Sequence, residues 1–434
     1  MEPALKKPKT ERLQCNYYNP QKSRQCGMTR RADAEYCSEH INLLKKQEGG
    51  AVHAGSIQGG RERVPCPLDP HHTVWKDQLK RHVKKCNTNK LAHANDGQIF
   101  YSCDMNRGDA IETEKVDYQE CIGDAVKLLQ ELRDSPELSA VEIPLSQKCN
   151  EHMQNSRINE LHNQKHAIQQ SSLIQNMLDC DVLNPLSPTQ DYLEFGCGRA
   201  EFSRYLNQVV YTACKDEPRQ ITYHLVDRGS NRMKFDSKFP TDTQEITGQK
   251  KVVPAIRRVK IDIKDLKMDT QLSPERTYVA LSKHLCGVAT DLTLRCIVNN
   301  PVFKQKLDGL CIAMCCRHVC DPRDYVNAEF IKSLIADKTT LSYFQFFTCL
   351  TKMCSWATSG RRPGMGDSDV VQITDNVSMT VEQREELGLL ARKIIDTGRY
   401  NWVKKHLGED VRLVRYVDKD ISLENVALIL RTSR

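Results

Sequence analysis

Eight cysteine and histidine residues within the first 90 positions constrain the fold of this chain more than any other feature. The first set consists of Cys15, Cys26, Cys37 and His40. Three thiolates and one imidazole match the tetrahedral preference of zinc. The surrounding segment has few large apolar side chains and needs such an ion to fold, so we predict a Cys3His zinc module over residues 10–42. The alternative is a tail of scattered cysteines without fixed structure.

A second set has the spacing of a zinc finger in which a helix supplies two ligands. It consists of Cys66, His72, His82 and Cys86. His82 and Cys86 are four residues apart in DQLKRHVKKC, so a helix places both on one face. We predict a CHHC zinc finger over residues 63–90, joined to the first module by a glycine-rich flexible linker over 43–62. The basic residues of the predicted helix suit either phosphate contacts or a solvated surface.

The opening of the chain and its cysteine content indicate an intracellular, reducing environment. The first 15 residues are charged and lack an apolar signal segment, and no run of about 18 apolar residues occurs anywhere. Nineteen cysteines in such a protein point to metal ligation and buried thiols rather than to disulfides. We therefore expect localisation to the nucleus or the cytoplasm and no membrane partner. Residues 6–9 (KKPK) form a weak candidate nuclear signal.

Positive charge is concentrated in the same N-terminal region. Residues 1–90 contain 18 Lys and Arg against 9 Asp and Glu, a net charge of +9. The whole chain carries +7, so the remaining residues carry −2. A basic region that also binds zinc suggests a polyanionic partner, most simply a nucleic acid. A basic surface that only keeps the protein soluble is the alternative.

The C-terminal two thirds of the chain alternate between apolar strands and amphipathic helices. After a partly helical connecting region over 91–150, five segments have the apolar pattern of buried strands, and two more near the C-terminus are spaced as an antiparallel hairpin. This is the plan of an α/β fold, a doubly wound, Rossmann-like class I domain that binds S-adenosylmethionine, and we predict it for residues 151–434. The five segments are DYLEF, TYHLVDR, IRRVKIDIKDL, TYVALSKHLCG and GLCIAMCCRHVC; the two near the C-terminus are VRLVRYV and NVALILR.

The turn after the first strand is suited to a nucleotide-like cofactor. In LEFGCGRAEF, two glycines stand where a strand passes into a helix, which permits close approach of a ligand to the backbone and to free N–H groups. The third glycine of the dinucleotide fingerprint is missing, which argues against hydride-transfer cofactors. Asp227 ends the second strand, where a carboxylate accepts hydrogen bonds from a ribose diol. The predicted cofactor contacts are Glu194, Gly196, Gly198, Asp227 and Asp262.

Polar residues at the carboxyl ends of the fourth and fifth strands are the candidates for catalysis, because ligands of open α/β sheets bind at that edge. We favour Lys283, since burial beside a cationic cofactor lowers the pKa of an amine toward that of a useful base. The alternatives are a packed histidine at 284, a phosphate contact at 317 and a helix cap at 291. The candidates are Lys283, His284, Asp291, Arg317 and His318.

The heptad MCCRHVC, residues 314–320, contains three cysteines but lacks a second pair of ligands at metal spacing. This argues against a third zinc site there. By the two-residue period of a strand, Cys311 and Cys315 face the same side, which favours apolar filling. A glycine-rich, basic segment over 355–369 is typical of either a substrate loop or disorder.

The two finger patterns, together with LEFGCG, SKHLCGVATDLTLRC and AMCCRHVC, closely resemble the eukaryotic tRNA 2′-O-methyltransferases that modify the fourth nucleotide of the acceptor stem. The resemblance covers nearly the whole chain, although Cys197 stands where other methyltransferases often carry alanine or serine. It implies S-adenosylmethionine as methyl donor, two zinc ions, and the 2′-hydroxyl of tRNAs for glycine, proline and histidine as acceptor. The CHHC finger also resembles one in a minor-spliceosome protein, so alone it indicates RNA.

Two other classes of function fit parts of the sequence. One is an RNA-binding or scaffold protein with an inactive methyltransferase fold, although the complete set of predicted cofactor contacts argues against it. The other is a methyltransferase that acts on a protein or a small molecule and uses its fingers for protein contacts.

Overall fold

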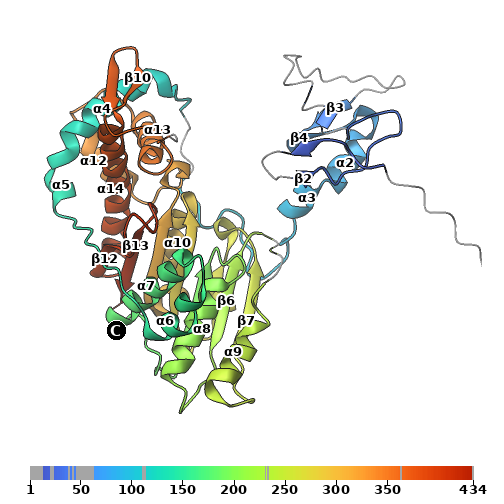
Figure 1. Ribbon diagram of the computed structural model, residues 1–434, viewed down its shortest axis with the longest axis vertical. Coiled ribbons are helices and arrows are strands. Elements are labelled where there is room, and N and C mark those ends of the chain that lie inside the picture. Colours follow the sequence, from blue (N-terminus) through green and yellow to red (C-terminus); the bar gives the residue numbers. More distant parts are fainter. Residues whose placement is uncertain are drawn as a thin grey trace, which may run out of the picture. The chain divides into compact units, whose positions relative to one another are not determined.

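The computed structural model divides into two compact units, Met1–Asp96 and Gly97–Arg434 (Figure 1). Residues 45–62 of the predicted linker and the candidate nuclear signal at 6–9 lie outside the described part of the chain. None of the helices within that part combines the length and the apolar run that crossing a membrane requires. The described residues are 13–19, 24–37, 40–41, 44, 63–109, 114–229, 231, 234–361 and 364–432.

The described residues of the first unit form only short elements of regular structure. β1 pairs with β2 and β3 pairs with β4, both antiparallel. Two helices, α2 and α3, follow the second pair along the chain. Among the described residues before Gly97, every buried apolar side chain belongs to a cysteine of the two predicted ligand sets. The elements are β1 (Tyr18–Asn19), β2 (Arg24–Gln25), β3 (Arg63–Cys66), β4 (Asp69–Trp75), α2 (Leu79–Lys85) and α3 (Asn87–Ala92).

The second unit is built on a seven-stranded, mostly parallel sheet with the order β12-β13-β9-β8-β5-β6-β7. The predicted α/β organisation is confirmed, including the antiparallel hairpin of β12 and β13, which places β13 against β9. The strands are β5 (Gln190–Phe195), β6 (Thr222–Asp227), β7 (Ala255–Lys260), β8 (Thr277–Cys286), β9 (Leu307–Cys315), β12 (Asp410–Arg415) and β13 (Val426–Arg431).

Both faces of this sheet are apolar and covered by helices. On β5, Leu193 and Phe195 enter one core, while Tyr192, next to Leu193, enters the other, as the alternation of a strand requires. Helices α7, α8 and α9 contribute to the Tyr192 side, and α10, α11 and α14 to the other. These helices are α7 (Lys165–Asp179), α8 (Glu201–Ala213), α9 (Lys238–Thr247), α10 (Val288–Asn299), α11 (Pro301–Lys306) and α14 (Val381–His406).

A third core lies among helices at one end of the unit. Helices α4, α12 and α13 pack around the first half of α14, with the β10–β11 hairpin against α4 (Figure 1). Thus α4, from the segment predicted as a connecting region, is part of the second unit. The remaining elements are α4 (Tyr118–Glu131), α5 (Pro136–Ser139), α6 (Glu151–Ser156), α12 (Ala328–Ile335), α13 (Tyr343–Cys354), β10 (Val370–Thr374) and β11 (Val377–Thr380).

Candidate functional site

The first predicted ligand set converges on one point. The four ligand atoms of Cys15, Cys26, Cys37 and His40 lie within 4.8 Å of one another. His40 Nδ1 is 3.5 Å from Cys15 Sγ and 3.3 Å from Cys37 Sγ. The Tyr17 ring stacks on the His40 ring with 3.8 Å between centroids, which fixes the imidazole.

The second set converges in the same way. The Cys66 and Cys86 sulfurs are 3.9 Å apart, the His72 and His82 Nε2 atoms 3.0 Å, and Cys66 Sγ and His82 Nε2 3.2 Å. The other ring nitrogen of His72 faces an Asp69 carboxylate oxygen at 3.3 Å, the carboxylate contact that orients many metal-binding histidines.

Both clusters fit zinc. Ligand atoms about 2.0–2.3 Å from a tetrahedral centre are about 3.3–3.8 Å from each other, and the measured separations fall around these values. Helix α2 carries His82, and Cys86 follows its last residue, so local helix geometry sets this pair. Ions at these points would crosslink the first unit, whose described cysteines form no disulfide.

A cavity of about 700 Å³ opens at the carboxyl edge of the sheet in the second unit. This volume is in the range of small-molecule sites. Four of the residues predicted at the site line it, from the ends of four neighbouring strands: Gly196, Asp227, Asp262 and His284.

The glycine turn after β5 approaches the neighbouring strand closely. Gly196 has a φ of 64°, and a Cβ there would lie 3.1 Å from the carbonyl oxygen of His284. Gly198 follows with a φ of 52° and donates its N–H to Asp227 at 2.7 Å. Only glycine combines this backbone conformation with this space at 196, so the turn leaves room for a ligand.

Two carboxylates border the cavity at the ends of β6 and β7. Asp227 accepts N–H groups from Gly198 and Gly229, and Asp262 accepts the N–H of Lys264. Each carboxylate oxygen can accept more than one hydrogen bond, so both residues retain acceptor capacity toward a ribose diol. The cavity therefore fits a nucleoside-bearing cofactor.

Glu194 lies behind the turn rather than in the cavity. It is 4% exposed, and its carboxylate accepts hydrogen bonds from the N–H and the hydroxyl of Ser203 in the first turn of α8. Burial raises its pKa to about 7. Glu194 does not line the cavity, and its bonds to Ser203 join α8 to β5; its direct contact with the cofactor stays a prediction.

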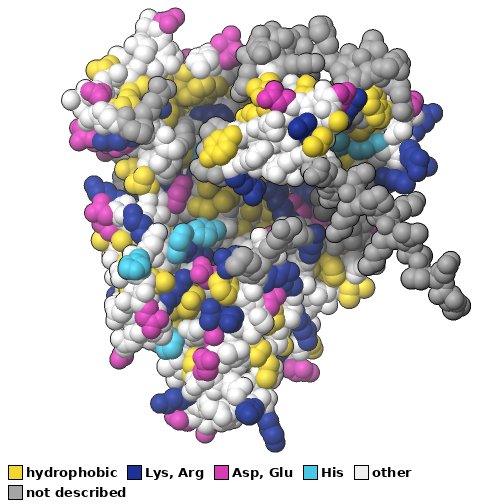
Figure 2. Space-filling view, turned by 45° about the vertical axis from the view of Figure 1, so that its right-hand side comes forward, with side chains coloured by type: hydrophobic (Ala, Val, Ile, Leu, Met, Phe, Trp, Pro, Cys, Tyr) yellow, Lys and Arg dark blue, Asp and Glu magenta, His cyan; other side chains and the backbone are white. Residues whose placement is uncertain are grey.

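Lys283 lies in a polar cluster beside the cavity. Its side chain is 5% exposed, and its ammonium donates to His284 Nε2 at 2.9 Å and His166 Nδ1 at 3.1 Å. Burial lowers the pKa of Lys283 to about 8. Figure 2 shows histidine side chains grouped with lysine and arginine on one face of this unit.

The two imidazoles around Lys283 are neutral near pH 7. Although His284 is partly exposed, the surrounding protein and the Lys283 charge lower its pKa to about 4. The Lys283 charge first and burial second lower the pKa of His166. His166 comes from α7 and was not predicted, because no local spacing relates it to residue 283.

The predicted catalytic residues Arg317 and Asp291 are instead components of the core. Arg317 is 1% exposed and pairs with Asp396 at 2.7 Å and Glu424 at 2.6 Å. Asp291 is fully buried against Arg399 at 2.6 Å. Neither lines the cavity, and each already has its partner, so we leave both out of the proposed reaction.

Two further predicted features do not themselves line the cavity. His318 is exposed in a short 3-10 turn, next to Val319, which lines the cavity. In the described part of the segment 355–369, Arg361 pairs with Asp367 and Glu385, which ties the segment to the helical end of the unit.

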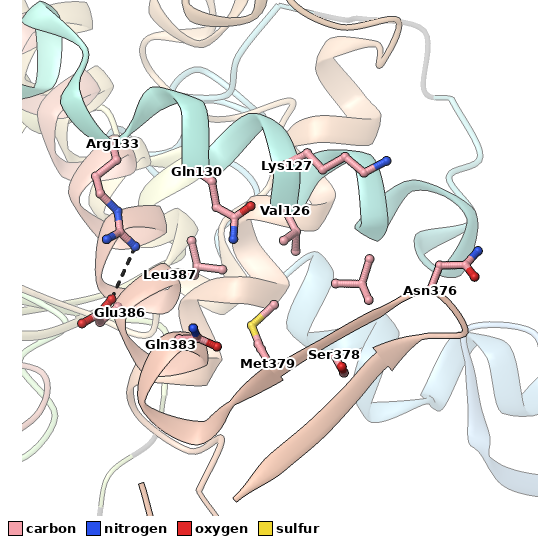
Figure 3. Close-up of a pocket in the computed structure, with 11 residues that line it drawn as sticks. Val126, Lys127, Gln130, Arg133, Asn376, Ser378, Met379, Gln383, Glu386 and Leu387 are labelled. Carbon is pink, nitrogen blue, oxygen red and sulfur yellow. Dashed lines mark hydrogen bonds and ion pairs between the residues drawn. The ribbon is translucent and has the colours of Figure 1, made fainter. Parts of the chain in front are cut away.

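A second cavity, of about 470 Å³, lies at that helical end between α4, the β10–β11 hairpin and α14 (Figure 3). An ion pair of 3.4 Å between Arg133 and Glu386 borders it. It contains none of the predicted site residues.

Three family descriptions match successive parts of the chain. "Methyltransferase TRM13" matches residues 168–431, "CCCH zinc finger in TRM13 protein" residues 13–41, and "U11-48K-like CHHC zinc finger" residues 63–87. The finger matches contain both ligand sets described above.

Similar proteins extend over nearly the full length. The Saccharomyces cerevisiae protein named tRNA:m(4)X modification enzyme TRM13 is 44% identical, over 99% of this chain and 98% of its own. The protein of that name from Vanderwaltozyma polyspora is 44% identical over 99% of both chains. A mouse homologue is 28% identical over 95% and 93%. The solved apo structure of methyltransferase SibL aligns with 63% of this chain and 64% of its own, at 10% identity and a TM-score of 0.18.

Proposed function

Because the chain belongs to the TRM13 methyltransferase family, we propose that it transfers a methyl group from S-adenosylmethionine to the 2′-hydroxyl of nucleotide 4 in the acceptor stem of tRNA. The observation that carries this proposal is the cavity at the carboxyl edge of the sheet, bordered by Gly196, Asp227 and Asp262. The full-length similarity to proteins named for tRNA modification supports the substrate. The proposed substrates are tRNAs for glycine, proline and histidine.

The strand order supports the finer assignment of the second unit as a doubly wound class I methyltransferase domain. In such folds the cofactor binds where strand order reverses, beside the first strand. Here β5 lies between β6 and β8, and the cavity lies at the carboxyl ends of these strands. We assign Asp227 to the ribose diol and the turn at Gly196 to the remainder of the cofactor.

The cofactor supplies an activated methyl group on a sulfonium, so the chain must orient the acceptor hydroxyl and remove its proton. As the oxygen forms its bond to the methyl carbon, the carbon–sulfur bond breaks and the hydroxyl proton is released. We assign the acceptance of that proton to Lys283, because its amine is held beside the cavity wall by His284 and His166. A base with a pKa near the working pH is the most effective kind.

The two N-terminal modules are proposed to bind one zinc ion each and to contact the tRNA. Their basic residues favour the phosphate backbone, so binding should weaken steeply with added salt as counterions are released. This division leaves the cofactor to the second unit and much of the RNA affinity to the first.

The test is transfer of labelled methyl groups from S-adenosylmethionine to three acceptors offered separately: tRNA transcripts, a protein extract freed of RNA, and a mixture of small metabolites. Label in tRNA alone supports the proposal. Label in protein or in a small molecule would replace it with the alternative substrate class. Cofactor binding without transfer to any acceptor would favour an inactive RNA-binding protein.

A further inference from the structure

Three cysteines from two strands meet beside the cavity. The sulfur atoms of Cys286, Cys315 and Cys316 lie within 4.8 Å of one another, and those of Cys286 and Cys315 are 3.4 Å apart. The last separation is in the range found above for pairs of ligands in the zinc clusters. The proposed reaction does not use these three thiols, and although Cys315 is buried, none of the three belongs to the three hydrophobic clusters.

The sheet assembles this group from positions 29 residues apart. Strands β8 and β9 run parallel, and after a shift of register between Ser282 and Leu285, Cys286 stands opposite Cys315. The neighbouring strand therefore adds Cys286 to the two cysteines, Cys315 and Cys316, of the heptad MCCRHVC. Sequence spacing alone cannot show such a partner.

The backbone at Cys316 holds the third thiol in place. Cys316 has a φ of 51°, a left-handed conformation that non-glycine residues adopt only where their surroundings require it. Its N–H donates to Glu424 at 3.1 Å, and Glu424 also accepts from Arg317 and Arg392. A buried ion network thus fixes the turn that brings Cys316 to the other two sulfurs.

We propose that Cys286, Cys315 and Cys316 bind a third zinc ion, in addition to the two ions assigned to the N-terminal modules. Soft thiolate ligands select zinc among the common divalent ions. Among the described residues, no other Cys, His, Asp or Glu joins this group, so three protein ligands leave a fourth position open. Three ligands with one open position is the arrangement of catalytic rather than structural zinc sites.

The site has direct access to the reaction cavity. Cys286 is exposed and lines the cavity, whereas Cys315 is buried and Cys316 half-buried. An ion in this place borders the cavity, and its open position takes an oxygen ligand, either water or a substrate hydroxyl. Zinc makes a bound oxygen ligand more acidic, which is useful for methyl transfer to a hydroxyl. Only this consequence rests on the proposed function; metal binding itself does not.

The test counts zinc in the full-length protein. Wild-type protein and two variants, Cys286→Ser and Cys149→Ser, are kept reduced, incubated with excess Zn²⁺ and freed of unbound ion, and zinc per chain is measured by plasma mass spectrometry. Cys149 is an exposed cysteine outside all three clusters and is the matched control. Equal melting temperatures of the three proteins show that the fold is retained.

We expect three zinc ions per chain in the wild type and in Cys149→Ser, and one fewer in Cys286→Ser. Replacement by Co²⁺ should give the same difference in the sulfur-to-cobalt absorption. Equal zinc content in all three proteins would overturn the proposal. A disulfide between Cys286 and Cys315 would also overturn the proposal if it persists under the reducing conditions of the assay. Such a disulfide lowers the protein mass by two hydrogen atoms, and protein isolated without reductant provides the reference for this mass. Because no RNA or methyl donor is present, failure here is separate from failure of the proposed reaction.

Discussion

The interiors of the two units of this protein differ in the side chains that they bury. In the described part of the first unit, the buried apolar side chains are the predicted ligand cysteines themselves, so we propose that zinc takes the place of a hydrophobic core there. The second unit buries three apolar clusters on the two faces of a sheet and among helices. On the proposed function, the first unit depends on zinc for its fold, whereas the second is stabilised by its own packing and binds its cofactor at the edge of its sheet.

The units also differ in how far their sites are visible in the sequence. The eight ligands of the first unit lie in two short segments, so spacing reveals both sets. The cavity of the second unit is formed by the ends of several strands. Only its glycine turn and the aspartates that end two of these strands can be recognised from a short stretch of sequence. Four experiments test this contrast.

The largest effect is expected from Cys66→Ala. Structural zinc contributes about 10–16 kcal/mol of apparent binding free energy in finger peptides, so the second finger should lose its ion and unfold. Affinity for tRNA should fall at least tenfold while affinity for S-adenosylhomocysteine stays unchanged, measured by filter binding and calorimetry. Cys149→Ala serves as the control. An equal loss of both affinities would contradict the separation of the two units.

Lys283→Met should lower turnover about 10²- to 10⁴-fold, the usual contribution of a general base, without changing cofactor affinity. Methionine keeps the length of the buried stem, so packing is preserved. Lys338→Met, at an exposed lysine, is the control. Turnover within twofold of the wild type would remove Lys283 from the reaction.

Arg399→Met should destabilise the second unit by about 3–5 kcal/mol, because it leaves the buried Asp291 carboxylate without its partner. Denaturant unfolding should show this loss in the second unit, while zinc content stays unchanged. Replacing both residues, as Asp291→Leu with Arg399→Met, should recover much of the stability. Loss of the zinc ions assigned to the two N-terminal modules on Arg399→Met would show that the units are not independent.

The pH profile should show the smallest effect, about tenfold per pH unit. Lys283 accepts a proton only as the neutral amine, and burial lowers its pKa to about 8. Turnover at saturating substrate should therefore rise with pH up to about 8 and level off above it. An ordinary lysine would place the inflection near 10.4. The inflection should disappear in Lys283→Met, and its persistence there would assign it to another group.

The sequence predicted the elements of the sheet well because buried strands and terminal turns have local patterns. The resemblance to the family is confirmed by full-length similarity, and the terminal hairpin by its pairing.

The sequence could not show which polar residues the fold would pair with one another. Arg317 is predicted as a catalytic candidate because it follows a strand, but its partners Asp396 and Glu424 come from elements far along the chain. His166 also comes from a distant part of the chain, so the sequence does not reveal its contact with Lys283. The same holds for Cys286 and Cys315. Long-range pairing, not residue type, decides whether such groups face the core or the cavity.

The measurement that tests the account most directly is the position of the methyl group on tRNA. Unmodified transcripts of tRNA for glycine, proline and histidine are incubated with the protein and labelled S-adenosylmethionine, then digested, and the labelled fragment is sequenced by mass spectrometry. The account predicts a 2′-O-methyl group at nucleotide 4 with wild-type protein and its near absence with Lys283→Met. A methyl group on a base, or at another position, would contradict the proposed reaction.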